Sequence, residues 1–421
     1  MISKWHWLLS QLGQQLWLRA GLFALMGILT ALLGVAAETF LPPDLPDLVG
    51  ADAVGTVLNV LASSMLAVTT FSLGVMVSAY SAATTNVTPR ATRLLMQDST
   101  TQNVLSTFIG SFLFSLVGIV TLTIEGYGDR GRLVLFVVTI IVIVVVVMAL
   151  LGWVDHLSRL GRVSETSERV EQAATLAIRR RSEQPYMGGQ RLDGSLAIPP
   201  DARAVVASET GYVQHVDTAA IQDAATEHGA RVYLQVLPGT FVHAGRQLAL
   251  VDVASGTPAD ELGDAVGAAI TVGHERTFEQ DPRFGLVVLA EIASRALSPA
   301  INDSGTAIDI IGRLARVLSC WANETGRQAD EVKCPAVYVP ALAESDLFED
   351  AFMMIARDGA DRLEVQLRVQ KALRNLSEIG DPAFKAAAVS RSLQSLGEAE
   401  RGLHFVAELE RVRAASPMAG A

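Results

Sequence analysis

Four long apolar stretches, all of them before His156, constrain this chain more than any other feature of its sequence. A helix needs about 20 mostly apolar residues to cross the hydrocarbon layer of a bilayer, and each stretch is long enough. We therefore predict four transmembrane helices within a membrane domain of residues 1–156. The spans are expected near residues 16–41, 54–80, 104–124 and 133–153.

Basic residues in the short loops predict the orientation of these spans, because Lys and Arg concentrate on the cytoplasmic side. The first loop, residues 41–52, contains three Asp and no Lys or Arg, whereas the second loop carries Arg90 and Arg93. Further arginines follow the fourth span, including the triplet at 179–181, which can meet anionic lipid heads. The pattern predicts a multi-pass protein of the bacterial inner (plasma) membrane with both termini in the cytoplasm.

The second span is rich in Ser, Thr, Gly and Ala, whereas the fourth is almost purely aliphatic. Small and hydroxylated residues allow helices to pack closely, which is one interpretation of the second span. The other is that this span lines a polar pathway, with Ser64, Thr70, Gly74 and Ser78 as pore-lining candidates. No ionisable side chain is expected deep within a span, which disfavours a proton-coupled transporter. Because four spans are few for a pore, we expect a homo-oligomeric channel gated by its cytoplasmic domain.

The chain after His156 is predicted to form a cytoplasmic α+β region. Residues 157–200 are predicted as a juxtamembrane helix and linker, 201–258 as a small β-barrel or sandwich, and 259–421 as a helical domain. Within the β-rich segment, Val232, Leu234 and Val236 alternate with Tyr233 and Gln235, as in a half-buried strand.

Composition and motifs disfavour several classes of function. The net charge of -11 falls mostly on the region after His156, and nucleic-acid binding needs a basic face instead. Cys320 and Cys334 lack the spacing and the nearby His residues of a zinc site, so neither a metal nor a cofactor is expected. No GxSxG, Walker, GxGxxG or HExxH motif occurs, so we do not expect an enzyme.

The densest polar cluster is residues 273–282, followed by Glu291 and by Asn302-Asp303. One interpretation is a ligand or regulatory site, in which His274 and Glu279 bind a cation with Asp303 while Arg276 holds a carboxylate or phosphate. The other is structural: Arg276 pairs with Glu279 or Glu291, and Asp281 and Asn302 cap helices. The candidate residues are His274, Arg276, Glu279, Asp281, Asn302 and Asp303. This cluster supports the alternative function, a non-conducting membrane sensor or scaffold that binds a small ligand, an ion or a protein.

Several stretches, in order along the chain, resemble one family. They are Phe71-Ser72-Leu73, Thr88-Pro89-Arg90, ERTFEQD at 275–281, Phe284-Gly285-Leu286 and LSPAIND at 297–303. Together they are similar to the bacterial predicted-membrane-protein family catalogued as domain of unknown function 2254. Similar proteins usually read SQFSPR where residues 85–90 read TNVTPR. The resemblance covers almost the whole chain and implies an integral membrane protein with a cytosolic C-terminal domain, without an established activity.

Overall fold

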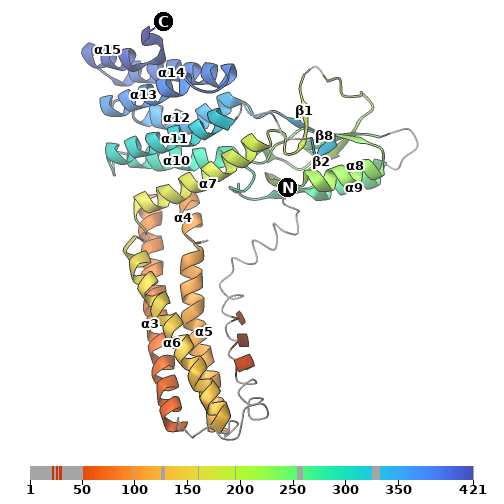
Figure 1. The fold of residues 1–421 in the computed structure, drawn as a ribbon. Coiled ribbons are helices and arrows are strands. Elements are labelled where there is room, and N and C mark those ends of the chain that lie inside the picture. Colours follow the sequence, from red (N-terminus) through yellow and green to blue (C-terminus); the bar gives the residue numbers. More distant parts are fainter. Residues whose placement is uncertain are drawn as a thin grey trace. The chain divides into compact units, whose positions relative to one another are not determined.

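The structure is a computed structural model of the chain (Figure 1). It describes residues 21–22, 25–26, 28–30, 51–96, 98–124, 129–159, 161–194, 196–253, 259–324 and 332–420. The chain divides into two compact units. We call the described residues of 8–85 and 92–165 the span unit, and those of 86–91 and 166–421 the α/β unit.

Among the described residues of the span unit, three helices are long and apolar enough to cross a membrane. They are α3 (Ala51–Asn86), α5 (Ser99–Thr123) and α6 (Asp129–Arg159), with the short α4 (Pro89–Met96) between the first two. These helices confirm the predicted spans at 54–80, 104–124 and 133–153 as apolar helices of sufficient length. The first predicted span, 16–41, lies mostly outside the described residues, so the structure supports three candidate spans rather than four.

Small side chains on α5 allow close packing inside the span unit. Ser106, Ser111 and Ser115 are buried, and the last two donate to backbone oxygens four residues earlier at 2.7 and 2.8 Å. A Cβ atom on Gly118 would lie 3.0 Å from Cδ1 of Leu58, so no larger residue fits without displacing a neighbour. For α5, therefore, the small residues serve helix packing.

The predicted helix from His156 towards 181 is in fact two helices. Helix α6 ends at Arg159, and α7 (Val163–Glu183) begins after Gly161, whose φ is +81°. Only glycine adopts this left-handed conformation without strain, which explains why the helical pattern stops there.

Eight strands of the α/β unit form two sheets. One has the order β1-β8-β4-β6-β2 and the other β5-β3-β7. The strands are β1 (Gly189–Leu192), β2 (Arg203–Val206), β3 (Gly211–Val216), β4 (Arg231–Leu234), β5 (Phe241–Val242), β6 (Gln247–Asp252), β7 (Ile270–Gly273) and β8 (Cys334–Pro340). The helices α8 (Thr218–Glu227) and α9 (Ala259–Ala269) share one apolar core with both sheets.

Of the two forms predicted for residues 201–258, a small β-barrel or a sandwich, these sheets do not support a closed barrel. Strand β8 lies between β1 and β4 and is parallel to both, so the larger sheet takes strands from before and after that segment. The strand expected at residues 232–236 is β4, but Tyr233 is as buried as Val232 and Leu234, so the strand is not half-buried. The side chain of Asp217 accepts the N–H of Ala220 at 3.1 Å and caps α8.

The remainder of the α/β unit is a stack of helices (Figure 1). They are α10 (Pro282–Ala296), α11 (Ser304–Glu324), α12 (Glu344–Asp358), α13 (Leu363–Ser377), α14 (Pro382–Gly402), α15 (Val406–Ala415) and the 3-10 helix η1 (Pro417–Gly420). Helix α10 packs against α11 and α12, and α14 packs against α12 and α13. This stack confirms the helical C-terminal region, and α10 leads from it to the candidate site.

Candidate functional site

The ERTFEQD stretch is a loop between β7 and α10 that is bound along strand β3. The amide of Gln280 accepts the N–H of Val216 at 2.9 Å and donates to the carbonyl of the same residue at 3.3 Å. In return, Gln214 Nε2 donates to the carbonyl of Glu275 at 2.7 Å. These bonds satisfy backbone groups of β3 and fix the position at which α10 begins.

Arg276 and Asp281 form a bidentate ion pair at the start of α10. Arg276 Nε and Nη2 donate to the two oxygens of Asp281 at 2.7 and 3.0 Å. Asp281 Oδ1 also accepts the N–H groups of Arg283 and Phe284, at 3.1 and 3.2 Å. Burial raises the pKa of Asp281, and the Arg276 guanidinium and the two N–H groups oppose this shift. Asp281 thus caps α10, as the structural interpretation expected, but Arg276 pairs with it and not with Glu279 or Glu291.

The other candidates of the polar cluster lie apart. His274 and Asn302 are exposed, and Asn302 has a φ of +54° in the turn that ends LSPAIND. Asp303, rather than Asn302, caps α11: its Oδ1 accepts the N–H of Thr306 at 3.0 Å. This bond and the Thr306 hydroxyl lower the pKa of Asp303. Among the described residues no three His, Cys, Asp or Glu side chains are placed to hold a metal ion, so the predicted cation ligands do not converge.

Residues 86–91, which join α3 to α4, belong by their contacts to the α/β unit. An Arg90 guanidinium nitrogen donates to a carboxylate oxygen of Glu291 on α10. Val87 and Ala91 on either side are fully buried. Burial raises the pKa of Glu291, while Arg90 and hydrogen bonding to Thr88 lower it. The Thr88-Pro89-Arg90 stretch is therefore held on α10 by apolar burial and by an ion pair.

Helix α7 crosses α10 at Gly285. A Cβ atom there would lie 2.3 Å from Cβ of Ala174 on α7, a separation that two side-chain atoms cannot adopt. The glycine of Phe284-Gly285-Leu286 is thus required for the close contact of the two helices, which fixes the C-terminal part of α7 beside the start of α10.

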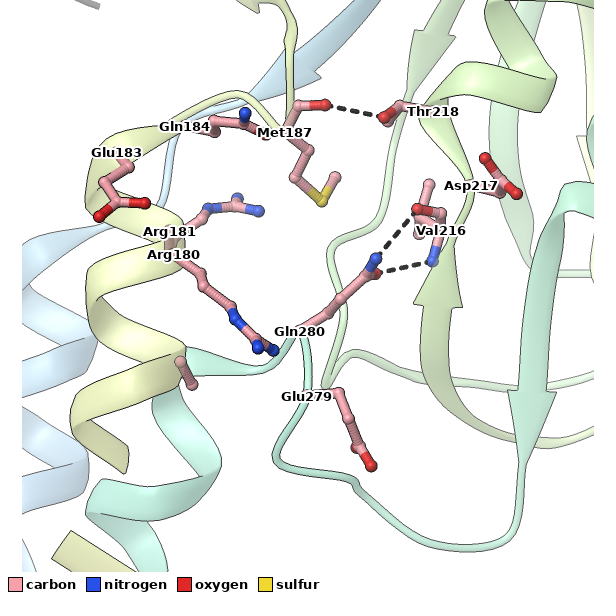
Figure 2. Close-up of a pocket in the computed structure, with 11 residues that line it drawn as sticks. Arg180, Arg181, Glu183, Gln184, Met187, Val216, Asp217, Thr218, Glu279 and Gln280 are labelled. Atoms are coloured by element: carbon pink, nitrogen blue, oxygen red, sulfur yellow. Dashed lines mark hydrogen bonds between the residues drawn. The ribbon is translucent and has the colours of Figure 1, made fainter. Parts of the chain in front are cut away.

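A cavity of about 290 Å³ lies where α7 ends (Figure 2). We call it the Arg181 pocket; its walls include Arg180, Arg181, Met187, Val216, Thr218 and Gln280. Arg181 is only 5% exposed, and its Nε and Nη2 atoms have no hydrogen-bond partner within the part of the chain that the structure describes. Burial lowers the pKa of Arg181 to about 10, against the attraction of Asp281.

The sequence interpretation missed Arg181 because it treated residues 179–181 as one basic group. Successive helix residues point about 100° apart, so three adjacent arginines face three directions. Arg181 follows Ala174, Ala177 and Ile178 on the buried stripe of α7. That spacing was the available signal.

A second cluster that was not predicted lies in the span unit. His156 Nε2 lies 2.8 Å from Oδ2 of Asp98, and that oxygen also accepts the N–H of Thr101 at 2.9 Å. The His156 ring stacks on Trp153, whose indole N–H donates to Ser72 at 2.9 Å. These contacts connect the start of α5, the end of α6 and the middle of α3.

The pore-lining candidates share the exposed side of α3. Ser64, Thr70 and Ser78 are exposed, and nothing among the described residues lies within 4 Å of a Cβ placed on Gly74. The hydroxyls of Ser64 and Thr70 donate to backbone oxygens four residues earlier.

Comparison with known proteins gives the family. Residues 13–375 match the model described as "Predicted membrane protein (DUF2254)". The chain belongs to the DUF2254 family. Uncharacterised proteins of Mycobacterium bovis and Mycobacterium tuberculosis are each 34% identical over 148 residues, a match that covers 34% of this chain and 28% of the relative. The chain thus matches less than a third of the length of these relatives, and no solved structure matches it.

In this DUF2254 protein, most stretches that carried the resemblance meet around α10. ERTFEQD leads into the helix, Gly285 lies in its first turns, and Arg90 binds Glu291 near its middle. LSPAIND follows the helix, and Arg362 holds this turn by donating to the carbonyl of Leu297 at 3.0 Å. Helix α10 is therefore the element that connects the Arg181 pocket with residues 86–91.

Proposed function

We propose that this DUF2254 protein is a non-enzymatic, membrane-anchored sensor whose α/β unit acts on the spans through residues 86–91. The observation that carries the proposal is the attachment of these residues to α10 by Arg90 and Glu291. Because α3 precedes the segment and α4 follows it, any shift of α10 is passed along the backbone to a candidate span. In this proposal, a change at the start of α10 reaches the membrane helices through residues 86–91.

A double-mutant test of this coupling needs no ligand. Asp281→Asn perturbs the start of α10, and we expect it to raise hydrogen–deuterium exchange in residues 86–91 of the full-length protein in lipid nanodiscs. Glu291→Gln breaks the attachment, so the effect of Asp281→Asn on residues 86–91 should disappear in the double variant. Asp303→Asn, which makes the same change at the cap of the neighbouring helix α11, is the matched control and should leave residues 86–91 unchanged.

The outcome against the sensor is also defined. If Asp281→Asn leaves exchange in residues 86–91 at the native level, or if its effect is the same with and without Glu291→Gln, α10 does not transmit to the segment. The proposal would then fail, whatever the unit binds.

We further propose that the α/β unit is cytoplasmic and that the membrane is the bacterial inner membrane. Arg90 and Arg93 lie in α4, between the end of α3 and the start of α5, and Arg159 is the last residue of α6. Following the three candidate spans along the chain, these ends fall on one side. The excess of basic residues at these ends supports the cytoplasmic side.

A homo-oligomeric channel is the second candidate, and the exposed side of α3 favours it. Ser64, Thr70, Gly74 and Ser78 can line a pore only if several copies surround an axis. In planar bilayers, the purified protein should then conduct, Thr70→Leu should alter permeation, and Arg276→Ala should mainly alter gating. Val144→Leu on the aliphatic, exposed side of α6 is the control. Absence of conductance under voltage, tension and osmotic challenge would count against a channel.

A further inference from the structure

Two arginines of the α/β unit offer the same pair of donors in different settings. Arg276 uses Nε and Nη2 to hold both oxygens of Asp281. In Arg181, Nε and Nη2 have no hydrogen-bond partner among the described residues, although the residue is only 5% exposed. These two atoms form the edge of a guanidinium that matches the spacing of oxygens in a carboxylate or phosphate.

Arg181 lines a cavity, and its Nε and Nη2 atoms are buried. Figure 2 shows the Arg181 side chain extending from α7 towards the space between Met187 and Gln280. Gln280 is held on the far wall by its two bonds to Val216, and Met187 is held by the Thr218 hydroxyl, which donates to its carbonyl at 2.7 Å. The walls are thus fixed by their own hydrogen bonds, and the guanidinium is left without one. A buried charge in this condition is unfavourable unless a counter-ion binds.

The surroundings favour an anion of small size. Arg180 supplies a second positive charge in the pocket wall. Helix α8 begins at Thr218, which also lines the pocket, so the positive end of the helix dipole lies there. The Asp217 carboxylate caps α8, and Figure 2 shows Glu279 pointing away from both arginines. The described lining contains no aromatic ring on which a base could stack, and about 290 Å³ is at the small end of ligand pockets.

We propose that the Arg181 pocket binds a small oxyanion, a phosphate or carboxylate group held by the Arg181 guanidinium. The inference rests on the proposed function in that it names the ligand class of the sensor. Gln280, which lines the pocket, precedes Asp281, and Asp281 caps the helix that carries Glu291. A ligand in the pocket would therefore lie next to the start of α10, the helix to which residues 86–91 are attached.

The test uses the full-length protein in detergent, with inorganic phosphate and acetate as probes and chloride at equal ionic strength as the blank. Isothermal titration should show binding of at least one probe to the native protein. Arg181→Met should weaken that binding by roughly tenfold or more, because it removes both charge-assisted donors. Arg180→Met is the matched control on the exposed neighbour and should change affinity by only about two- to threefold.

Two further variants separate an anion site from a structural arginine. Arg181→Lys keeps the charge but loses the fork, so it should also bind more weakly. Arg181→Met without ligand should unfold at the native temperature or above it, because an unpaired buried charge is gone. Glu279→Gln should leave anion binding intact or tighten it.

The results that overturn the site are equally specific. They are no binding of either probe by the native protein at millimolar concentration, binding that Arg181→Met leaves unchanged, or loss of binding only in Arg180→Met. A short-chain phosphatidic acid that binds through Arg181 where inorganic phosphate does not would support the same chemistry with a lipid as its source. Arg90→Ala distinguishes this inference from the sensor: it should break the attachment of residues 86–91 but leave probe affinity unchanged.

Discussion

Two arginines of the α/β unit differ in their partners. Arg276 is paired with Asp281, whereas Nε and Nη2 of Arg181 have no hydrogen-bond partner among the described residues. The spacing of Asp281 before Pro282 and Phe284 was enough to predict a helix cap, because capping is local along the chain. The partner of Arg276 could not be predicted, because Glu279, Asp281 and Glu291 all follow it closely enough in the sequence to pair with it. Arg181 could have been found from helix periodicity, but its lack of a partner depends on residues from β3 and the 274–281 loop, which no local pattern brings together.

Removing the Asp281 carboxylate should destabilise the α/β unit. Asp281→Ala leaves Arg276 unpaired in a site where it is 19% exposed and also removes the cap of α10. We expect the free energy of unfolding to fall by about 3 kcal/mol, the usual loss when one partner of a buried pair is deleted. Guanidinium denaturation of the full-length protein in detergent, followed by fluorescence, measures this change.

The control for this prediction is an exposed ion pair. Arg203 and Asp260 have side-chain exposures of 58% and 93%, so Arg203→Ala should change the free energy by no more than about 0.5 kcal/mol. Equal losses in the two variants would show that the Asp281 pair is worth no more than a surface pair.

The raised pKa of Glu291 predicts a pH dependence. An acid whose pKa is higher in the folded chain than in the unfolded chain is destabilised when ionised, and this penalty exists above the folded pKa. Glu291→Gln is neutral at every pH, so it should be at least as stable as the native protein at about pH 7.5. The difference should shrink as the pH falls through the folded pKa towards 4.5, the ordinary value for Glu.

Denaturation curves of both proteins across this pH range test the sign. If the native protein is the more stable one at neutral pH and loses that advantage on acidification, the attraction of Arg90 outweighs the burial of Glu291. The raised pKa would then be contradicted.

At the scale of elements, the apolar helices could be predicted, whereas the pairing of β1 with β8 could not. Hydropathy or helical periodicity over many residues predicts α3, α5, α6, α10 and α11. Strand β1 is four residues long and follows a Gly- and Pro-rich turn, and its partner β8 comes much later in the chain. A pairing of that kind has no signature in either segment alone, so the barrel or sandwich predicted for residues 201–258 did not include β1 or β8.

Two glycines on neighbouring span helices should respond differently to the same substitution. Gly118→Val places atoms against Leu58 and Leu135, and we expect a loss of about 1–3 kcal/mol from overpacking. Gly74→Val meets open space within the chain and should not lower the thermal unfolding temperature of the protein in detergent. If instead Gly74→Val disrupts a homo-oligomer on size-exclusion chromatography, the exposed side of α3 is an interface.

For the whole molecule, the orientation of the spans can be tested by labelling. In a protein lacking Cys320 and Cys334, we expect Thr123→Cys to react with a membrane-impermeant maleimide from outside intact cells. Arg159→Cys should react only after permeabilisation, because basic residues concentrate at its end of the spans. The reverse pattern would place the α/β unit outside the cytoplasm.

The same assay addresses the first predicted span. A cysteine replacing Ser3 should be protected in intact cells if residues 16–41 cross the membrane, since an even number of spans leaves both termini on one side. Reaction from outside would leave three spans and separate the termini.

The position of β8 between β1 and β4 has a consequence for biosynthesis. The segments for all the span helices leave the ribosome first, and β4 follows with one edge unpaired until residues 334–340 have been made. During that interval the nascent chain is already tethered to the bilayer while it carries an open strand edge, the feature that promotes pairing with other chains. Shortening the chain ahead of residue 334 should accordingly give a membrane-inserted product prone to aggregation and degradation.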